Sequence, residues 1–218
     1  MRIVSLNLSP IREVSHKGRV VRTGIYKQPT QVPVMLRERG FDGDQQADKK
    51  HHGWITQAAY AFAAEEYAHW RATLARADLP FGLFGENLTV EGLDDEKVCI
   101  GDVYRVGDAR VQVTFPREPC STLAMAVNDT GFPKVFLARK RVGPYFRVLA
   151  EGLVQTGDEV ARESAHPARL SIAQAIDLMH FAEGDAAQLR GRYQRAAQIE
   201  ALDERWKTKF VRMAAAQE

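Results

Sequence analysis

Hydrophobic and polar residues alternate along several short stretches of the first 165 residues. The period of two is clearest from Ala109 to Phe115, where the odd positions are apolar and the even positions are polar. This alternation predicts a half-buried strand. Further short strands are predicted at residues 1–8, 19–26, 32–37, 87–92, 98–106, 142–149, 152–154 and 157–160. Many short strands separated by Gly and Pro indicate a closed or strongly curved sheet, with helices at its periphery.

Helical patterns take over in the last quarter of the chain. Ser171, Asp185 and Asp203 can each cap a helix, and an apolar stripe follows each of them. Within the first part, helices are predicted at residues 57–76, 121–128 and 133–141. The longest of these is expected to pack outside the sheet. We therefore expect a mainly β domain over residues 1–165 and a three-helix module over residues 166–218.

The composition is that of an ordinary globular protein. The 218 residues are 45% hydrophobic and 27% charged, and 30 Lys and Arg stand against 28 Asp and Glu. This near balance gives no electrostatic reason to expect nucleic acid or a membrane surface as a partner. Two cysteines are too few for a disulfide scaffold, and the first residues look like a strand and not like a signal peptide. These features favour a cytoplasmic protein.

The candidate chemistry lies at the end of the strand that stops at Phe115. The next residues are Pro116-Arg117-Glu118-Pro119-Cys120, so two prolines restrain a loop that carries a thiol. The nearby guanidinium of Arg117 favours the thiolate, which attacks electrophiles and binds soft metals. The alternative is that Cys120 is a buried small apolar residue, as most free cysteines are. Cys99 lies inside an alternating stretch and is expected to be structural.

Two polar stretches are further candidates. Residues 45–54 have no regular period and contain His51 and His52, so they predict a loop at a site. Adjacent histidines seldom face one metal, and a zinc site would need another ligand nearby. Glu86 and Asn87 lie at the edge of a predicted strand, where the alternative to a site is an ordinary turn.

Several motifs, taken in order, resemble the MOSC-domain family, the fold of the C-terminal part of molybdenum cofactor sulfurases. They are Gly43-Asp44-Gln45-Gln46-Ala47-Asp48, His52-Gly53, Gly85-Glu86-Asn87-Leu88, Gly101-Asp102 and Pro116-Arg117-Glu118-Pro119-Cys120. The YiiM-like branch is the most similar, because it also carries a C-terminal three-helix extension. The resemblance implies a closed β-barrel domain that binds a molybdenum–pterin cofactor.

The resemblance also implies roles for individual residues. Cys120 would be the molybdenum ligand or the carrier of its sulfur, with His52 and Arg117 as the other catalytic residues beside it. His52 could relay a proton near neutral pH. The pterin phosphate would suit Lys or Arg. The cofactor-binding candidates are Lys27, Lys49, Lys50, Glu86, Asn87 and Arg117.

The implied function is reduction of N-hydroxylated compounds such as hydroxylamino purines, with electrons from a partner flavoprotein. The alternative is a carrier that delivers the cofactor, or sulfur on Cys120, to another protein; a thiol enzyme without a metal is a third option. The family as a whole also suggests pyridoxal phosphate binding, and the chain is expected to be a monomer or homodimer. One departure is that Trp54, Ile55 and Thr56 follow Gly53, where the family has a second Gly and then an Asp.

Overall fold

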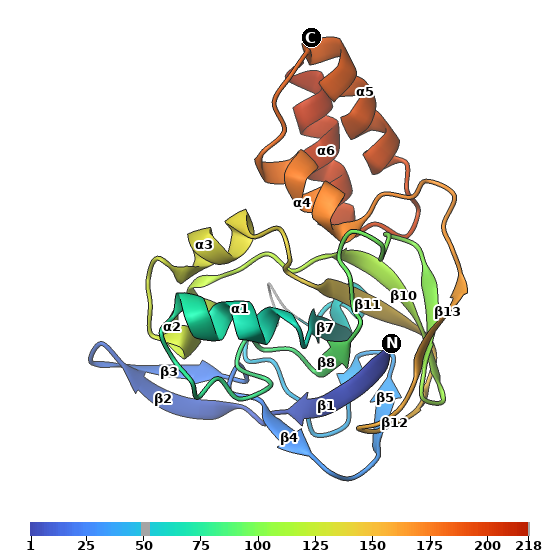
Figure 1. The fold of residues 1–218 in the computed structure, drawn as a ribbon. Helices are drawn as coiled ribbons and strands as arrows, with labels where there is room; N and C mark the ends of the chain where they lie inside the picture. Colours follow the sequence, from blue (N-terminus) through green and yellow to red (C-terminus); the bar gives the residue numbers. More distant parts are fainter. Residues whose placement is uncertain (49–52, 218) are drawn as a thin grey trace.

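The structure is a computed structural model that describes residues 1–48 and 53–217. Eight strands form the main sheet: β1 (Arg2–Leu8), β4 (Gln28–Thr30), β7 (Ala59–Ala63), β8 (Leu88–Glu91), β9 (Val103–Val106), β10 (Ala109–Pro116), β11 (Pro144–Ala150) and β13 (Val160–Ser164). Their order in the sheet is β13-β9-β10-β11-β7-β8-β1-β4 (Figure 1). Neighbours are antiparallel except β7 and β8, which run parallel, so the sheet is mixed.

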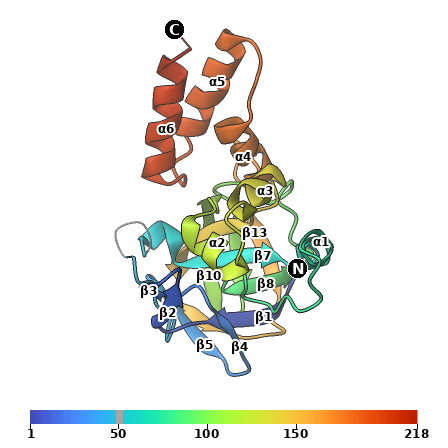
Figure 2. The ribbon, with the colours of Figure 1, turned by 90° about the vertical axis from the view of Figure 1, so that its left-hand side faces the viewer.

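Smaller elements surround this sheet. A second sheet has the order β12-β5-β6, and a separate hairpin pairs β2 with β3. Their bounds are β2 (Arg12–His16), β3 (Arg19–Thr23), β5 (Val34–Arg37), β6 (Gly40–Phe41) and β12 (Gly152–Val154). The helices are the 3₁₀ helix η1 (Ile55–Gln57), α1 (Glu66–Thr73), α2 (Ser121–Val127), α3 (Phe132–Ala138), α4 (Ile172–His180), α5 (Ala186–Ala197) and α6 (Glu204–Ala215). The last three stand together beyond one end of the β domain (Figures 1 and 2).

The prediction of a closed barrel is wrong, because no sheet formed by the described residues closes on itself. The main sheet has open ends at β13 and β4. The edge strand β4 is three residues long, contains Pro29 and pairs only with the end of β1. The start of β1 meets the chain before β13 through a single bridge, Arg2 to Glu159, and not through a ladder. Alternation in a sequence shows which face of a strand is buried, but not whether two edge strands meet.

The predicted helix over residues 57–76 is also wrong in its first half. Residues 55–57 form a 3₁₀ turn, Ala59–Ala63 form β7, and only Glu66–Thr73 are α-helical. All five residues of β7 are buried, because the strand lies between β11 and β8 in the middle of the sheet. A central strand buried on both faces has no polar alternation. Its three alanines therefore imitate a helical sequence.

An aromatic cluster joins β7 to the helices above it. Phe62 contacts the rings of Tyr67 and Phe136, with centroids 5.9 and 5.6 Å away. Trp70, fully buried on α1, stacks on Phe136 at 5.5 Å. These large apolar side chains contribute much of the buried surface in this part of the core. They fix α1 and α3 over β7, the strand that also supplies a wall of the site described below.

The three C-terminal helices begin where the capping residues predict. Ser171, Asp185 and Asp203 each accept a hydrogen bond from a backbone N–H in the first turn of their helix. Ser171 also forms a full capping box with Gln174. A cap satisfies an N–H that has no partner within the helix, which is why a local signal was sufficient here. The domain boundary between residues 165 and 166 stays a prediction.

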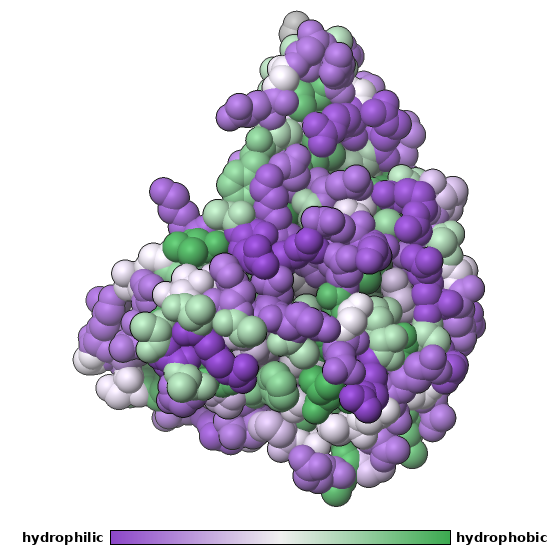
Figure 3. Space-filling model, viewed as in Figure 1, coloured by the Kyte–Doolittle hydropathy of each residue, from purple (hydrophilic) through white to green (hydrophobic). Residues whose placement is uncertain are grey.

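Charged and polar groups cover most of the visible surface. On the face shown in Figure 3, hydrophilic residues predominate and apolar residues appear in small groups. Single exposed apolar side chains of this kind are normal on a protein surface. Within residues 1–48 and 53–217, no helix is long and apolar enough to cross a membrane.

Candidate active site

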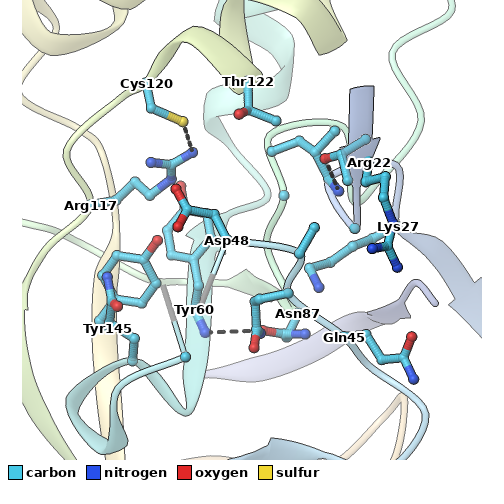
Figure 4. Close-up of a pocket in the computed structure, with 18 residues that line it drawn as sticks. Arg22, Lys27, Gln45, Asp48, Tyr60, Asn87, Arg117, Cys120, Thr122 and Tyr145 are labelled. Atoms are coloured by element: carbon cyan, nitrogen blue, oxygen red, sulfur yellow. Dashed lines mark hydrogen bonds between the residues drawn. The ribbon is translucent and has the colours of Figure 1, made fainter. Parts of the chain in front are cut away.

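A pocket lies where several loops of the β domain meet (Figure 4). Its empty space, including the open mouth, is about 720 Å³. The lining residues come from segments 22–27, 45–48, 53–60, 85–87 and 117–122, together with Tyr145. Segments far apart in the sequence thus converge on one cavity, and most of the predicted site motifs contribute to it.

Cys120 lies in the wall of this pocket, between the end of β10 and the start of α2. Strand β10 ends at Pro116, as the sequence predicts, and Cys120 takes an extended conformation just before Ser121 opens the helix. The cysteine is partly exposed, and its side chain makes no capping hydrogen bond. Its thiol is therefore held at the pocket by a short, proline-framed loop. We call residues Arg117–Cys120 the cysteine loop.

Arg117 carries a buried positive charge beside that thiol. Its Nη2 lies 3.9 Å from Cys120 Sγ, its Nη1 donates to the Glu118 carbonyl, and its guanidinium lies 5.7 Å from the centre of the Tyr60 ring. Burial alone would lower the pKa of Arg117, but Tyr145, Cys120 and Tyr60 outweigh it and raise the pKa. The side chain is 3% exposed, and no carboxylate of the described residues pairs with it. Its guanidinium thus donates to the Glu118 carbonyl and faces the Cys120 thiol.

The opposite wall is an ion-pair network centred on Asp44. Lys27 donates to Asp44 Oδ1, and both side chains are buried. Asn87 Nδ2 donates to the other oxygen of Asp44 at 3.0 Å, and the backbone N–H of Ser9 donates to Oδ1 at 2.9 Å. Asn87 also accepts from the Tyr60 backbone N–H at 3.3 Å. The network ties the first strand, the Asp44 motif and the start of β8 into one wall.

Gly24 allows the chain to come close enough to complete that wall. A Cβ at this position would lie 2.0 Å from the Gln45 carbonyl oxygen, far inside any real contact. Only glycine, which has no Cβ, permits this approach of one backbone to another. The close approach brings residues 22–27 against residues 45–48, two of the segments that line the pocket.

Glu86 points into the core and does not line the pocket. Its Oε1 accepts hydrogen bonds from Tyr67, from the Gly82 backbone N–H at 2.8 Å and from Thr89 at 2.9 Å. Burial raises the pKa of this carboxyl, although those donors act in the opposite direction. Its predicted role in cofactor binding stays a prediction, and its observed contacts are those of a residue that shapes the turn before β8.

The other sequence-predicted residues divide into two groups. Lys27, Asn87, Arg117 and Cys120 line one pocket, and their roles in binding or catalysis stay predictions. His52, Lys49 and Lys50 lie outside the described residues, so their roles stay predictions. The residues on either side of that gap, Asp48 and Gly53, both line the pocket.

Sequence reasoning missed the two tyrosines of the pocket. Tyr60 was placed in a helix, and Tyr145 was placed in a strand without a role; both line the cavity next to Arg117 (Figure 4). Burial raises the pKa of Tyr145, although the Arg117 charge opposes the shift. Its hydroxyl is therefore neutral and able to donate a hydrogen bond. Only the pairing of β11 with β7, Tyr145 opposite Tyr60, brings the two together, and no local pattern reports it.

Cys99 has the opposite environment to Cys120. It is 2% exposed, and burial together with the nearby Asp102 raises the pKa of its thiol. Its backbone bridges to Ser171 at the start of the C-terminal helices. A buried thiol with a raised pKa is a poor nucleophile. This environment agrees with the structural role predicted for Cys99.

Known proteins resemble the chain in sequence along most of its length. The family model for the MOSC domain matches residues 48–161. The uncharacterized protein YflK of Bacillus subtilis is 37% identical over 219 residues, covering 96% of this chain and 93% of that protein. Protein YiiM of Escherichia coli is 37% identical over 123 residues, covering 56% of this chain and 55% of the relative. A protein of Gibberella moniliformis named "Reductase" is 34% identical over 147 residues, which are 66% of this chain and 26% of that longer protein.

Solved structures show the same architecture. The crystal structure of YiiM from Geobacillus stearothermophilus has a TM-score of 0.79 at 30% identity, with 98% of each chain covered. YiiM from Escherichia coli has a TM-score of 0.75 at 22% identity and shows the same fold. With the fold, the pocket and these matches together, the chain belongs to the MOSC-domain family. Within that family it is a member of the YiiM-like branch.

The side chains of the pocket fit the molybdenum–pterin group with which this family is generally associated. A soft thiol at Cys120 suits a high-valent metal already bound by sulfur, and the buried charge of Arg117 suits an anionic cofactor. The residues described here include no cluster of three or more His, Cys, Asp or Glu able to hold a metal ion.

Proposed function

We propose that the chain is a molybdenum-cofactor-dependent reductase of N-hydroxylated compounds that takes its electrons from a partner flavoprotein. The observation that carries the proposal is the Cys120 thiol beside the buried charge of Arg117, in the wall of a pocket for a small ligand. The relative named "Reductase" supports the reaction class, since it shares 34% identity over 147 residues. Hydroxylamino purines are the proposed substrate type.

The overall reaction is a two-electron reduction. In R–NH–OH the N–O bond breaks, two electrons and two protons enter, and R–NH₂ and water leave. The flavoprotein supplies the electrons, and solvent supplies the protons through the pocket. When bound, the molybdenum–pterin cofactor would provide the redox centre between donor and substrate.

The pocket residues have distinct tasks in this proposal. Cys120 provides the thiolate ligand, and Arg117 holds the anionic part of the cofactor with the donors that it does not use on Glu118. Tyr145 keeps a neutral hydroxyl at the pocket wall and can donate a hydrogen bond to the substrate oxygen. His52 stays the predicted proton donor. Lys27 and Asn87 keep the opposite wall in place through Asp44.

The decisive experiment combines a metal assay with a turnover assay. Protein from a host that makes the cofactor would be analysed for molybdenum and released pterin, and for reduction of a hydroxylamino purine with a supplied flavoprotein reductase. Cys120→Ser replaces a soft thiolate by a hard hydroxyl, so turnover should be nearly abolished. Cys99→Ser is the matched control and should retain turnover. Full activity in Cys120→Ser would contradict the proposal.

A carrier function is the second candidate, because Cys120 is partly exposed and so accessible to a protein acceptor. It predicts no reduction by the wild type with any flavoprotein, together with Cys120-dependent transfer of sulfur or cofactor to an acceptor enzyme. Measuring both activities on the same preparations separates the two functions. Pyridoxal phosphate binding, a monomeric or dimeric state and a cytoplasmic location stay predictions.

A further inference from the structure

The side chain of Glu118, two residues before Cys120, turns away from the pocket and toward the C-terminal helices. Trp206 Nε1 donates to its Oε2 at 3.1 Å, and Lys209 Nζ lies 3.0 Å from each carboxylate oxygen. His180 Nε2 lies 3.3 Å from Oε1. The donors come from α4 and α6, so two helices of the C-terminal part converge on one carboxylate of the cysteine loop.

This carboxylate has a counter-charge at contact distance, because Lys209 Nζ lies 3.0 Å from both of its oxygens. The indole that donates to it is itself fully buried, with Trp206 1% exposed. A charge-assisted bond from a fixed ring restrains position more strongly than a bond from a flexible surface side chain.

The backbone carbonyl of Glu118 connects the restrained side chain to the Cys120 thiol through Arg117. Its carbonyl oxygen accepts a hydrogen bond from Arg117 Nη1, and Nη2 of the same guanidinium faces Cys120 Sγ at 3.9 Å. A guanidinium is planar and rigid, so fixing one nitrogen orients the other. Displacing the Glu118 peptide would therefore move the positive charge that lies next to the sulfur.

The first turn of α6 and its cap also contact two segments that lead into the pocket. Asp203 Oδ2 accepts from Thr56 Oγ1 at 2.6 Å, and the Thr56 carbonyl accepts from Thr114 Oγ1 at 2.7 Å. The Arg205 guanidinium lies 5.4 Å from the ring centres of both Trp54 and Phe115. The same helix thus contacts the segment after Gly53 and the end of β10, the strand that leads into the cysteine loop.

We propose that Glu118 is a positioning residue through which the C-terminal helices set the environment of the Cys120 thiol. His180, Trp206 and Lys209 hold its carboxylate, and its carbonyl orients Arg117 toward the sulfur. The inference rests on the proposed function only for the identity of Cys120 as the reactive group. It assigns the C-terminal helices a part in the chemistry of the site without placing any of their groups in contact with substrate.

The test measures the rate of Cys120 alkylation by iodoacetamide as a function of pH, in a Cys99→Ala background so that one thiol reports. Among the described residues, the charged and titratable groups near the loop include His180 on α4, Arg205 and Lys209 on α6, Arg117 and Glu118 in the loop, and Asp48, Tyr60 and Tyr145 in the pocket wall. In Glu118→Ala, loss of anchoring should move the half-maximal rate up by about 1 pH unit, the effect of losing a nearby opposite charge. A simple field effect predicts the reverse, because removing a negative charge favours the thiolate.

Further variants separate positioning from general damage. Glu118→Gln keeps an acceptor for Trp206 and Lys209 and should recover most of the wild-type profile. Lys209→Met should shift the profile upward, whereas the control Lys207→Met, whose amine bonds to Glu200 and Glu204 instead, should leave it unchanged. If Glu118→Ala does not fold, Trp206→Phe with Lys209→Met removes two of the three groups that hold the carboxylate and should shift the profile in the same direction.

The outcomes decide the inference separately from the proposed function. An unchanged or downward-shifted profile in folded Glu118→Ala, or an equal shift in Lys207→Met, would overturn the positioning role. The alkylation assay needs no cofactor and no substrate. If the wild type showed no hydroxylamine reduction while Glu118→Ala still moved the thiol profile upward, the reductase proposal would fail and the positioning role would stand.

Discussion

Arg117 and Lys27 are two buried cations on facing walls of one pocket, and they have opposite surroundings. Lys27 is paired with Asp44, whose carboxylate also accepts from Asn87 and Ser9. Arg117 has the Tyr60 ring, a carbonyl and the Cys120 sulfur as neighbours, and no carboxylate among the described residues. Both residues were equal candidates for phosphate binding from the sequence. The structure makes Arg117 the stronger one, because the charge of Lys27 is already neutralised.

The difference shows what a buried charge can do in each setting. In a buried ion pair with further hydrogen bonds, each charge is already compensated within the protein. Removing one partner leaves the other charge buried without compensation, which costs free energy of unfolding. Arg117 pairs with no carboxylate among the described residues and faces the Cys120 thiol, so it is the stronger candidate for holding an anionic ligand. The Lys27 wall is therefore expected to govern stability, and the Arg117 wall to govern binding. The predictions that follow test this division, starting with the largest effect.

Lys27→Met should cost about 3–5 kcal/mol of the free energy of unfolding, because it leaves the Asp44 carboxylate buried without its cation. Urea denaturation measures this directly. The double variant Lys27→Met with Asp44→Asn removes both charges and should regain a large part of the loss. If the double variant lost more free energy of unfolding than the two single variants lose together, the ion pair would not be the reason for the effect.

Arg117→Lys should affect cofactor retention more than folding. The substitution keeps the charge but removes the planar fork, and one lost charge-assisted hydrogen bond corresponds to about 10–100-fold weaker binding. The molybdenum-to-protein ratio after extensive dialysis is the readout. Arg22→Lys, at an exposed arginine of the same pocket, is the matched control and should retain the cofactor. Equal losses in both variants would remove the special role of Arg117.

A smaller effect concerns Asp95, a buried carboxyl behind the Arg117 wall. It accepts from the Gly143 N–H at 2.8 Å, and the Gly143 carbonyl accepts from the Arg117 N–H at 3.0 Å. Burial raises the pKa of Asp95 from 3.8 to about 7, although the Gly143 hydrogen bond and Arg141 oppose the shift. A raised folded-state pKa means stability that is present below about pH 4 and is lost as the pH rises through about 7.

Asp95→Asn should therefore flatten the stability profile between pH 4 and pH 8, since an amide does not titrate. Urea midpoints at several pH values measure this, and Glu96→Gln, at an exposed carboxyl nearby, is the control. If the free energy of unfolding of the wild type, relative to that of Asp95→Asn, did not fall between pH 4 and pH 7, the raised pKa of Asp95 would be contradicted.

Local signals predicted well those elements whose causes are local. The three capped helices start at Ser171, Asp185 and Asp203, and the strand before Pro116 ends where proline removes a donor. Lys27, Asn87, Arg117 and Cys120 come from separate turns and loops between strands and line one pocket, while their roles at the site stay predictions.

The failures have non-local causes. Ala59–Ala63 is a strand because β8 and β11 lie on either side of it, which nothing inside the segment reveals. The edge strand β4 pairs with residues 6–8, the end of β1, whereas β8 pairs with its first part, residues 2–6. No pattern within β4 itself shows this pairing. Tyr145 reaches the site through strand pairing, and Glu118 meets Trp206 across 88 residues. Sequence patterns identify the buried face and the ends of a helix or strand. Which strands pair and which distant side chains meet depends on the whole fold.

The contacts of α6 have a consequence for the order in which the protein is made. The hydrogen bond of Thr56 needs Asp203, which lies 147 residues further along the chain. The hydrogen bonds of Glu118 likewise need Trp206 and Lys209. Synthesis proceeds from the N-terminus at about 5–20 residues per second, so the sheet can form seconds before its last partners emerge. Under the proposed positioning role of Glu118, the environment of the Cys120 thiol is complete only after residue 209 has left the ribosome. Cofactor insertion would accordingly follow translation of the C-terminal helices, and a ribosome stalled before them would carry a β domain with an unfinished pocket.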